Sequence, residues 1–240
     1  MKLKLMTFNT QHCKNYNTNK IDYDSITILI KKYSPDIIGL NEIYGKGFDK
    51  KNAPDGQAAK LASELGYYYY FGVATKLWFK PYGNALLSKY PILNAEVIKI
   101  PYPLLKRGNM YYERRSIIKA TVNVDNNPLT VFISHFGLNG DEQENAFNTM
   151  IESLPNNNFI IMGDFNVDYD NSQLTKLYEK ASDTSEFFTT RKFTWPSDNP
   201  WVKYDYILTS KDIETNYADI PNEIVSDHRP YICEIELNSK

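Results

Sequence analysis

An acid and an amide follow a short apolar run at residues Phe159 to Asp168, FIIMGDFNVD. The run Phe159 to Met162 predicts a strand buried on both faces, and Gly163 allows the chain to turn after it. Asp164 and Asn166 are separated by one residue, so in an extended chain their side chains share one face. Such a pair can hold a hard cation, activate a water and donate to a phosphate oxygen. An Asp-Phe-Asn turn without any chemistry fits the same residues.

The same design, an apolar strand beside polar or acid-base side chains, recurs elsewhere in the chain. The further cases are Lys2 to Phe8 followed by Asn9, Asp36 to Leu40 followed by Asn41 and Glu42, Leu129 to Ser134 followed by His135, Tyr204 to Leu208 carrying Asp205, and SDHRP with Asp227 and His228 before the last strand. Each case alone has a structural explanation. Their repetition, always with side chains that bind metals or move protons, predicts one shared site.

With these residues the sequence resembles the endonuclease/exonuclease/phosphatase superfamily. The similarity rests on Asn9 in MTFNTQH, Glu42 in GLNE, His135 in SHF, Asp164 and Asn166 in GDFN, Asp205 in KYDYI, and Asp227 with His228 in SDHRP. The motifs occur in the family's order and extend from residue 9 to residue 228. GDFN and SDHRP are each fairly specific, and in this order with the others they are very specific.

The resemblance implies an α+β fold, a four-layer α/β/β/α sandwich of two packed mixed sheets flanked by helices. The site would lie where strand ends of both sheets converge. By the same resemblance, Glu42 is the principal metal ligand, with Asn9 and Asp227 beside it. Oxygen ligands of this kind suit Mg²⁺ or Mn²⁺, and a chain with only two cysteines is unsuited to a thiolate zinc site.

The resemblance also implies catalytic roles. Asp164 would orient or deprotonate the attacking water, and Asn166 would hold a phosphoryl oxygen. Asp205 would hold His228 in one tautomer, so that the imidazole shares charge that develops in the transition state. His135 would donate to a phosphoryl oxygen, and the sequence assigns it no carboxylate partner.

Two departures from the family pattern are visible. Asn41 stands where many members have Gln before the metal-binding Glu, so a supporting contact is expected to differ. The aromatic-proline-asparagine-glycine motif of AP endonucleases is missing after His135, which argues against abasic-site repair and favours the branch with deoxyribonucleases, sphingomyelinases and phosphatases. His12 is expected at the surface or beside the site.

Because the implicated residues come from both ends of the 240-residue chain, they can meet only in one fold, and we expect a single domain over residues 1–240. Hydrophobic residues make up 42% and charged residues 23%, as in ordinary globular proteins. The net charge of −2 provides no global basic field, which weakens the case for a tight nonspecific nucleic-acid binder. A nuclease remains compatible, since a bound cation and a local basic patch can attract phosphate.

The two cysteines, Cys13 and Cys233, do not form a disulfide framework, and we expect reduced structural thiols. A bridge between them becomes feasible if the first and last strands lie side by side. The N-terminus reaches Thr7 and Asn9 too soon for a secretory apolar core, and no segment approaches a membrane span. A cytoplasmic protein is therefore expected, although a processed secreted form would have the same sequence.

Helices and strands are predicted from apolar periodicity and from cap and turn residues. The predicted helices are Tyr23–Tyr33 capped by Asp22 or Asp24, Gln57–Leu65, Asp141–Leu154 capped by Asp141 with Glu144 completing a capping box, and Gln173–Lys180. Further strands are predicted at Tyr67–Gly72, Asn84–Ser88, Ile92–Ile100, Ser116–Val124 and Tyr231–Leu237. Residues Thr75–Gly83, Pro101–Arg115 and Thr189–Lys203 are predicted loops, and Asp212–Val225 has only a weak pattern.

Two loop features have more than one interpretation. Trp78, Phe79 and Tyr82 stand among lysines, so they could stack on bases or sugars, dip into lipid, or simply pack beneath the loop. Arg115 resembles an arginine common in bacterial members that could fork onto a phosphate, and it could equally pair with Glu113.

The sequence thus predicts a divalent-metal-dependent phosphoesterase that hydrolyses a phosphodiester by an activated water, as nucleases do. Its partner would be a phosphate-ester substrate, with nucleic acid among the candidates, and no stable membrane insertion is expected. The alternative is a phosphatase or phospholipase C-like enzyme acting on a small sugar, inositol or lipid phosphate. A noncatalytic binding module that kept the fold should have lost at least one key residue, and every key residue is present.

Overall fold

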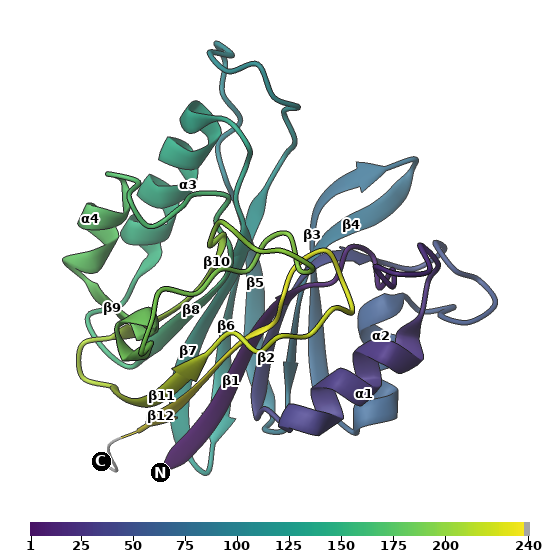
Figure 1. Cartoon of the computed structure of the whole chain (residues 1–240), viewed down its shortest axis with the longest axis horizontal. Coiled ribbons are helices and arrows are strands. Elements are labelled where there is room, and N and C mark those ends of the chain that lie inside the picture. The colour runs from purple at the N-terminus through teal and green to yellow at the C-terminus, as the bar shows by residue number, and fades with distance from the viewer. Residues whose placement is uncertain (238–240) are drawn as a thin grey trace.

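Two six-stranded sheets pack face to face in the computed structural model, which describes residues 1–237 (Figure 1). The first sheet has the order β11 (Glu214–Asp219), β12 (Tyr231–Glu236), β1 (Lys2–Asn9), β2 (Ile37–Tyr44), β4 (Lys80–Ser88) and β3 (Tyr68–Leu77). The second has the order β9 (Ala181–Asp183), β10 (Asp205–Ser210), β8 (Phe159–Asp164), β7 (Asn127–His135), β6 (Ser116–Val124) and β5 (Ile92–Lys99).

The two sheets share one pattern of strand directions. In the first, β1 is parallel to β2 and antiparallel to β12, and β2 is antiparallel to β4. In the second, β8 is parallel to β7 and antiparallel to β10, and β7 is antiparallel to β6. The strands that end in the similar segments MTFN and MGDFN, β1 and β8, therefore occupy equivalent positions.

Helices cover the outer face of each sheet, which completes the predicted four layers (Figure 1). On the first sheet lie α1 (Tyr23–Tyr33) and α2 (Gln57–Leu65), and on the second lie α3 (Gly140–Ser153) and α4 (Leu174–Tyr178), while a short 3₁₀ helix, η1 (Thr184–Phe187), follows β9. Asp22 begins α1 by accepting a hydrogen bond from the backbone N–H of Ser25, and Ser34 ends it in a left-handed conformation. The predicted fold class is confirmed.

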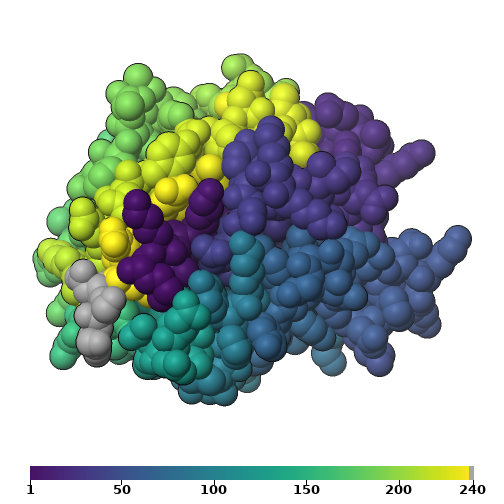
Figure 2. Space-filling model, turned by 90° about the horizontal axis from the view of Figure 1, so that it is seen from below, coloured from purple at the N-terminus to yellow at the C-terminus, as the bar shows by residue number. Residues whose placement is uncertain are grey.

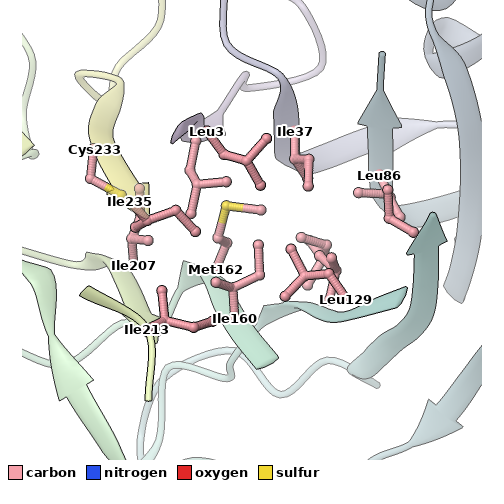
Figure 3. Packing of buried hydrophobic residues seen from close by; sticks show 14 of the residues in the cluster. Leu3, Ile37, Leu86, Leu129, Ile160, Met162, Ile207, Ile213, Cys233 and Ile235 are labelled. Atoms are coloured by element: carbon pink, nitrogen blue, oxygen red, sulfur yellow. The ribbon is translucent and has the colours of Figure 1, made fainter. Parts of the chain in front are cut away.

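The central core lies between the sheets and consists almost entirely of aliphatic side chains. Figure 3 shows Leu3 and Ile37 of the first sheet pointing toward Ile160 and Met162 of the second. Fully burying one such side chain stabilises the fold by about 1.5–3 kcal/mol. Because the central strands of both sheets are fixed by this layer, the residues at their ends are held in fixed positions.

Several predictions about local structure are wrong. Thr75–Gly83 is not a loop but the end of a β-hairpin, since β3 and β4 pair as far as Leu77 and Lys80. No element was predicted for the weakly patterned residues after Asp212, and they form β11, an edge strand. The N-cap of α3 is Asn139, and Glu142 completes the capping box in place of the predicted Asp141 and Glu144.

The first and last strands do pair, and in Figure 2 the purple N-terminal residues lie beside the yellow C-terminal segment. Cys13 nevertheless belongs to the layer under α1, whereas Cys233 belongs to the core between the sheets, and both are free and buried. The conceivable bridge between them is therefore not formed. Among the described residues no helix is long and apolar enough to cross a membrane.

Candidate active site

Strands of both sheets end at one place, each with a polar side chain. Asn9, the last residue of β1, pairs with Asn41 of the parallel strand β2, just before Glu42. In the second sheet His135 pairs with Asp164, and Asp164 pairs with Asp205. Since neighbouring strand ends lie about 5 Å apart, these registers alone bring the polar side chains of each sheet together.

Gly163 lets β8 deliver Asp164 close to β7. Its φ of +149° is unusual for a residue with a side chain, and a Cβ there would lie 1.8 Å from the carbonyl oxygen of Ser134. Any larger residue would push the two strands apart at the position where the site is built. The glycine before the acid in GDFN therefore has a packing reason.

Asn9 joins the two sheets at the site. Its Nδ2 donates to Glu42 Oε1 at 3.2 Å and to Asp164 Oδ2 at 2.9 Å, while its Oδ1 accepts from the backbone N–H of Gln11. Asn9 and Asp164 are almost fully buried, so the hydrogen bond between them is shielded from water. The amide thereby fixes the distance between the two acids.

His228 and Asp205 form a buried pair. Nδ1 of His228 lies 2.7 Å from Oδ2 of Asp205, and Nε2 of His228 lies 3.7 Å from Oδ2 of Asp164. Burial opposes a charge on this imidazole, but the nearby carboxylates of Asp205 and Asp164 outweigh it and raise the pKa of His228 to about 10. The ring is therefore protonated near neutral pH, and its Nε2–H faces the site.

His135 has the opposite kind of partner. Its Nδ1 lies 2.9 Å from NH1 of Arg115, and its Nε2 lies 3.5 Å from Oδ2 of Asp164. Burial and the Arg115 charge hold the pKa of His135 well below its usual range. Arg115 can only donate, so Nδ1 must accept and the single proton of the neutral ring sits on Nε2, pointing at the site.

Arg115 also contacts Glu113, with NH1 3.1 Å from Oε1 of that residue. Both side chains are about nine-tenths buried. Arg115 therefore pairs with Glu113, as one of the two interpretations of the sequence predicted. It also contacts His135, and through that ring it is connected to the site. Burial raises the pKa of Glu113, against the effect of Arg115.

Asp164 lies between the two histidines and is 1% exposed. Burial raises its pKa to about 7, although the His228 charge acts in the other direction. A carboxyl group with a pKa near neutrality can take up a proton and release it again at working pH. Its other oxygen, Oδ1, accepts from the backbone N–H of Asn166, which holds the carboxyl plane.

Asn166 is placed by a left-handed turn with a φ of +52°, a conformation that asparagine tolerates. Its Nδ2 donates to the carbonyl oxygen of Phe136 at 3.0 Å. One of the two Nδ2 hydrogens is thus in use, and the other is not used by this bond.

The three predicted metal ligands have donors that fit Mg²⁺ or Mn²⁺. Glu42 sits at a β-bulge with a φ of +59°, so the strand is distorted where its carboxylate enters the site. Burial and the Glu42 charge raise the pKa of Asp227, against the effect of His228. Two carboxylates that repel in this way would be stabilised by a divalent cation, and Asn9 Oδ1 keeps one lone pair for it.

Three other side chains at the site lie close enough together to hold a metal ion. Ligand atoms of Asp164, Asp205 and His228 all lie within 4.8 Å of one another. A protonated His228 has no lone pair for a metal, and it already neutralises part of the charge of both acids. The chemistry of this trio therefore suits proton transfer better than metal binding, and Glu42, Asn9 and Asp227 are the oxygen donors that fit a divalent cation.

The sequence singled out Asn41 and His12 beside the site without assigning their contacts, and the structure supplies these. Asn41 donates through Nδ2 to Asn84 Oδ1 and to the Ser134 carbonyl oxygen, and its Oδ1 accepts from the Asp164 backbone N–H. It therefore connects both sheets behind the site, and its position before Glu42 was the available signal. His12, left at the surface or beside the site, has its Nε2 3.7 Å from Oε2 of Glu42.

The sequence profile of the Endonuclease/Exonuclease/phosphatase family matches residues 6–228 of the chain. No curated protein matches it by sequence.

Solved structures have the same fold at low sequence identity. An endonuclease/exonuclease/phosphatase from Bacteroides vulgatus is 18% identical with a TM-score of 0.79, and the match covers 99% of this chain and 100% of that one. A family protein from Leptotrichia buccalis is 21% identical with a TM-score of 0.77 and coverages of 98% and 100%. A mannosyl-6-phosphatase from Bacteroides thetaiotaomicron is 15% identical with a TM-score of 0.75 and the same coverages.

Proposed function

The chain belongs to the endonuclease/exonuclease/phosphatase family, and from that premise we propose that it is a divalent-metal-dependent phosphoesterase that hydrolyses a phosphodiester with an activated water. One observation carries this proposal. Asp164 lies between a cationic His228 and a neutral His135, and Asn9 ties it to Glu42 across the two sheets. A proton acceptor flanked by two N–H donors is what attack of water on a phosphate ester needs.

In this proposal Asp164 accepts a proton from the attacking water as the new P–O bond forms. The ester P–O bond breaks, and the leaving oxygen departs as an alcohol after taking a proton from solvent. Nε2–H of His228 and Nε2–H of His135 donate to phosphoryl oxygens, where negative charge increases in the transition state. Asn166 holds a further phosphoryl oxygen through its remaining Nδ2 hydrogen.

Glu42, Asn9 and Asp227 would hold Mg²⁺ or Mn²⁺, which when bound neutralises charge on the phosphoryl group. Arg115 acts on the substrate through His135, since its guanidinium is already engaged by that ring and by Glu113. The substrate is a phosphate ester, and nucleic acid is one class of it.

A second candidate function is a phosphatase acting on a sugar phosphate. It is favoured by the fold match with the mannosyl-6-phosphatase, although 15% identity supports the fold alone. The net charge of −2 also suits a small substrate better than a long polyanion.

The test is turnover of soluble model substrates by the full chain. Bis-nitrophenyl phosphate and nitrophenyl phosphate are incubated with Mg²⁺ or Mn²⁺ and with a chelator, beside plasmid DNA, RNA and mannose 6-phosphate. We expect diester cleavage that the chelator abolishes and that Asp164→Asn lowers by about 10²- to 10⁴-fold. Hydrolysis of the monoesters alone would favour the second candidate, and full activity of Asp164→Asn would refute the roles assigned to the site.

A further inference from the structure

Two bulky aromatic residues occupy the turn of the hairpin between β3 and β4. Trp78 and Phe79 follow the last paired residue of β3, Leu77, and precede the first of β4, Lys80. Their φ angles are +51° and +64°, the left-handed values that a two-residue hairpin turn of type I′ requires at both positions. Asn-Gly is the usual choice there, because bulky side chains are strained in this conformation.

The strain is not offset by packing. Trp78 is 88% exposed and Phe79 is 96% exposed, so neither ring is buried by the fold. The sequence therefore places two large apolar side chains where both local conformation and water oppose them. A residue pair that breaks a local rule without a structural gain points to a role outside the fold.

A second exposed apolar group lies in the loop between β5 and β6. Leu104 is fully exposed and Leu105 is three-quarters exposed, and Met110 and Tyr111 of the same loop are also exposed. We refer to Trp78, Phe79, Leu104 and Leu105 as the apolar tips. Figure 1 shows the β3–β4 hairpin and the β5–β6 loop both projecting upward, beyond the ends of the central strands.

The strand registers relate both tips to the active site. Tyr44, two residues past Glu42, pairs with Tyr82, so the hairpin continues beyond the level of Glu42 for about 10 Å. The β5–β6 loop leaves the second sheet after Lys99, which pairs with Ser116, the neighbour of Arg115. Both tips therefore extend past the edge of the molecule that carries the site.

The chain segments that carry the tips are positively charged. Residues 74–83 contain Lys76 and Lys80 and no acid, and residues 101–112 contain Lys106 and Arg107 and no acid, in a chain whose net charge is −2. Trp and Leu beside Lys and Arg are the composition that enters the boundary between headgroups and acyl chains of an anionic bilayer. Leucines do not stack on bases as aromatic rings do, so they favour lipid over single-stranded nucleic acid.

We propose that the protein docks reversibly on anionic phospholipid bilayers through the apolar tips, with the active-site edge facing the headgroups. Docking of this kind lies in the interface and does not span the membrane. The proposal goes beyond the phosphoesterase activity and does not depend on it, because binding is measured without turnover.

The experiment is flotation of the full chain with vesicles of phosphatidylcholine, with and without phosphatidylserine, in a chelator. We expect the protein to float with the anionic vesicles and to be released by salt. Trp78→Asn/Phe79→Gly should weaken binding by about tenfold or more, because the apolar contact is lost. Ile28→Asn is the matched control, since Ile28 on α1 is 67% exposed but lies outside the tips.

Folding of the variant is checked by its melting temperature, which should equal or exceed that of the parent because Asn-Gly suits the turn. The proposal would be overturned if the unmodified protein floated with neither kind of vesicle. It would also be overturned if the double variant floated as well as the unmodified protein does. Binding of a labelled single-stranded oligonucleotide through the same aromatics, without vesicle binding, would also overturn it. Hydrolysis of soluble bis-nitrophenyl phosphate should be equal in parent and variant, and its absence from both would count against the proposed function alone.

Discussion

Two buried histidines flank Asp164, and the partner behind each ring gives it the opposite charge. Behind His228 stands the carboxylate of Asp205, which keeps the imidazole protonated. Behind His135 stands the guanidinium of Arg115, which together with burial keeps the imidazole neutral. Both present an Nε2–H to the site, but only one carries a charge.

In the proposed mechanism this difference lets one residue type serve two purposes in one site. A cationic donor stabilises charge on a phosphoryl oxygen more strongly than a neutral donor. Two cationic histidines next to Asp164 would lower its pKa and weaken it as a base. A neutral second donor avoids that cost.

The largest effect is expected from Asp205→Asn. A carboxamide cannot stabilise the imidazolium and permits the wrong tautomer of His228, so kcat on bis-nitrophenyl phosphate should fall by about 10³- to 10⁴-fold. Asp219→Asn on β11, where Asp219 pairs with Lys192, serves as a matched control and should leave kcat unchanged. Activity of Asp205→Asn within about threefold of the parent would remove the distinction between the two rings.

His135, the neutral histidine, should tolerate replacement by a neutral hydrogen-bond donor. His135→Ala should lower kcat by about 10²- to 10³-fold, the usual loss for one hydrogen-bond donor to the transition state. His135→Gln keeps an N–H donor and should recover about tenfold of that loss. His228→Gln should be as impaired as His228→Ala, because an amide carries no charge. Equal recovery by glutamine at both positions would contradict the comparison.

Arg115→Gln should have a smaller effect, a loss of about tenfold, since it acts through His135 and leaves that donor in place. Removing the guanidinium charge should raise the pKa of His135 toward its usual value. Arg115→Lys should restore most of the activity, because it restores the charge. A wild-type rate in Arg115→Gln, with an unchanged pKa of His135, would show that Arg115 has only a structural role.

The smallest change concerns the pH profile of kcat/KM. The rate should rise as Asp164 loses its proton near its pKa of about 7, because only the carboxylate can accept the proton of water. It should fall as His228 loses its proton near its pKa of about 10. In the residual activity of Asp205→Asn the fall should move to lower pH, since the carboxylate that raises the pKa of His228 is gone. If the fall of kcat/KM in Asp205→Asn occurs at the same pH as in the unmodified protein, a group other than His228 causes it.

Much of the fold follows from local signals in the sequence. α1 and β6 begin and end as predicted, because a cap, a proline boundary and a turn mark them. The β3–β4 hairpin was missed because Trp78 and Phe79 occupy its turn, where Asn-Gly is the usual sequence. β11 was missed because an exposed edge strand, ETNYAD, lacks an apolar alternation.

The candidate site was predictable as a set of residues but not as a network. Strand ends with polar side chains indicated which residues gather, since the carboxyl ends of parallel strands meet at one edge. The Arg115–His135 contact depends on the pairing of β6 with β7, which joins residues 20 positions apart. Asn41 bridges the two sheets only when they are packed together. The sequence alone does not predict how close the two sheets come at this position.

The protonation states of the two rings can be measured directly. The chain has only three histidines, so ¹⁵N NMR of the imidazoles in metal-free protein near neutral pH can be assigned with single His→Gln variants. We expect His228 to be protonated on both nitrogens and His135 to be neutral with its proton on Nε2. A neutral His228 or a protonated His135 would contradict the account.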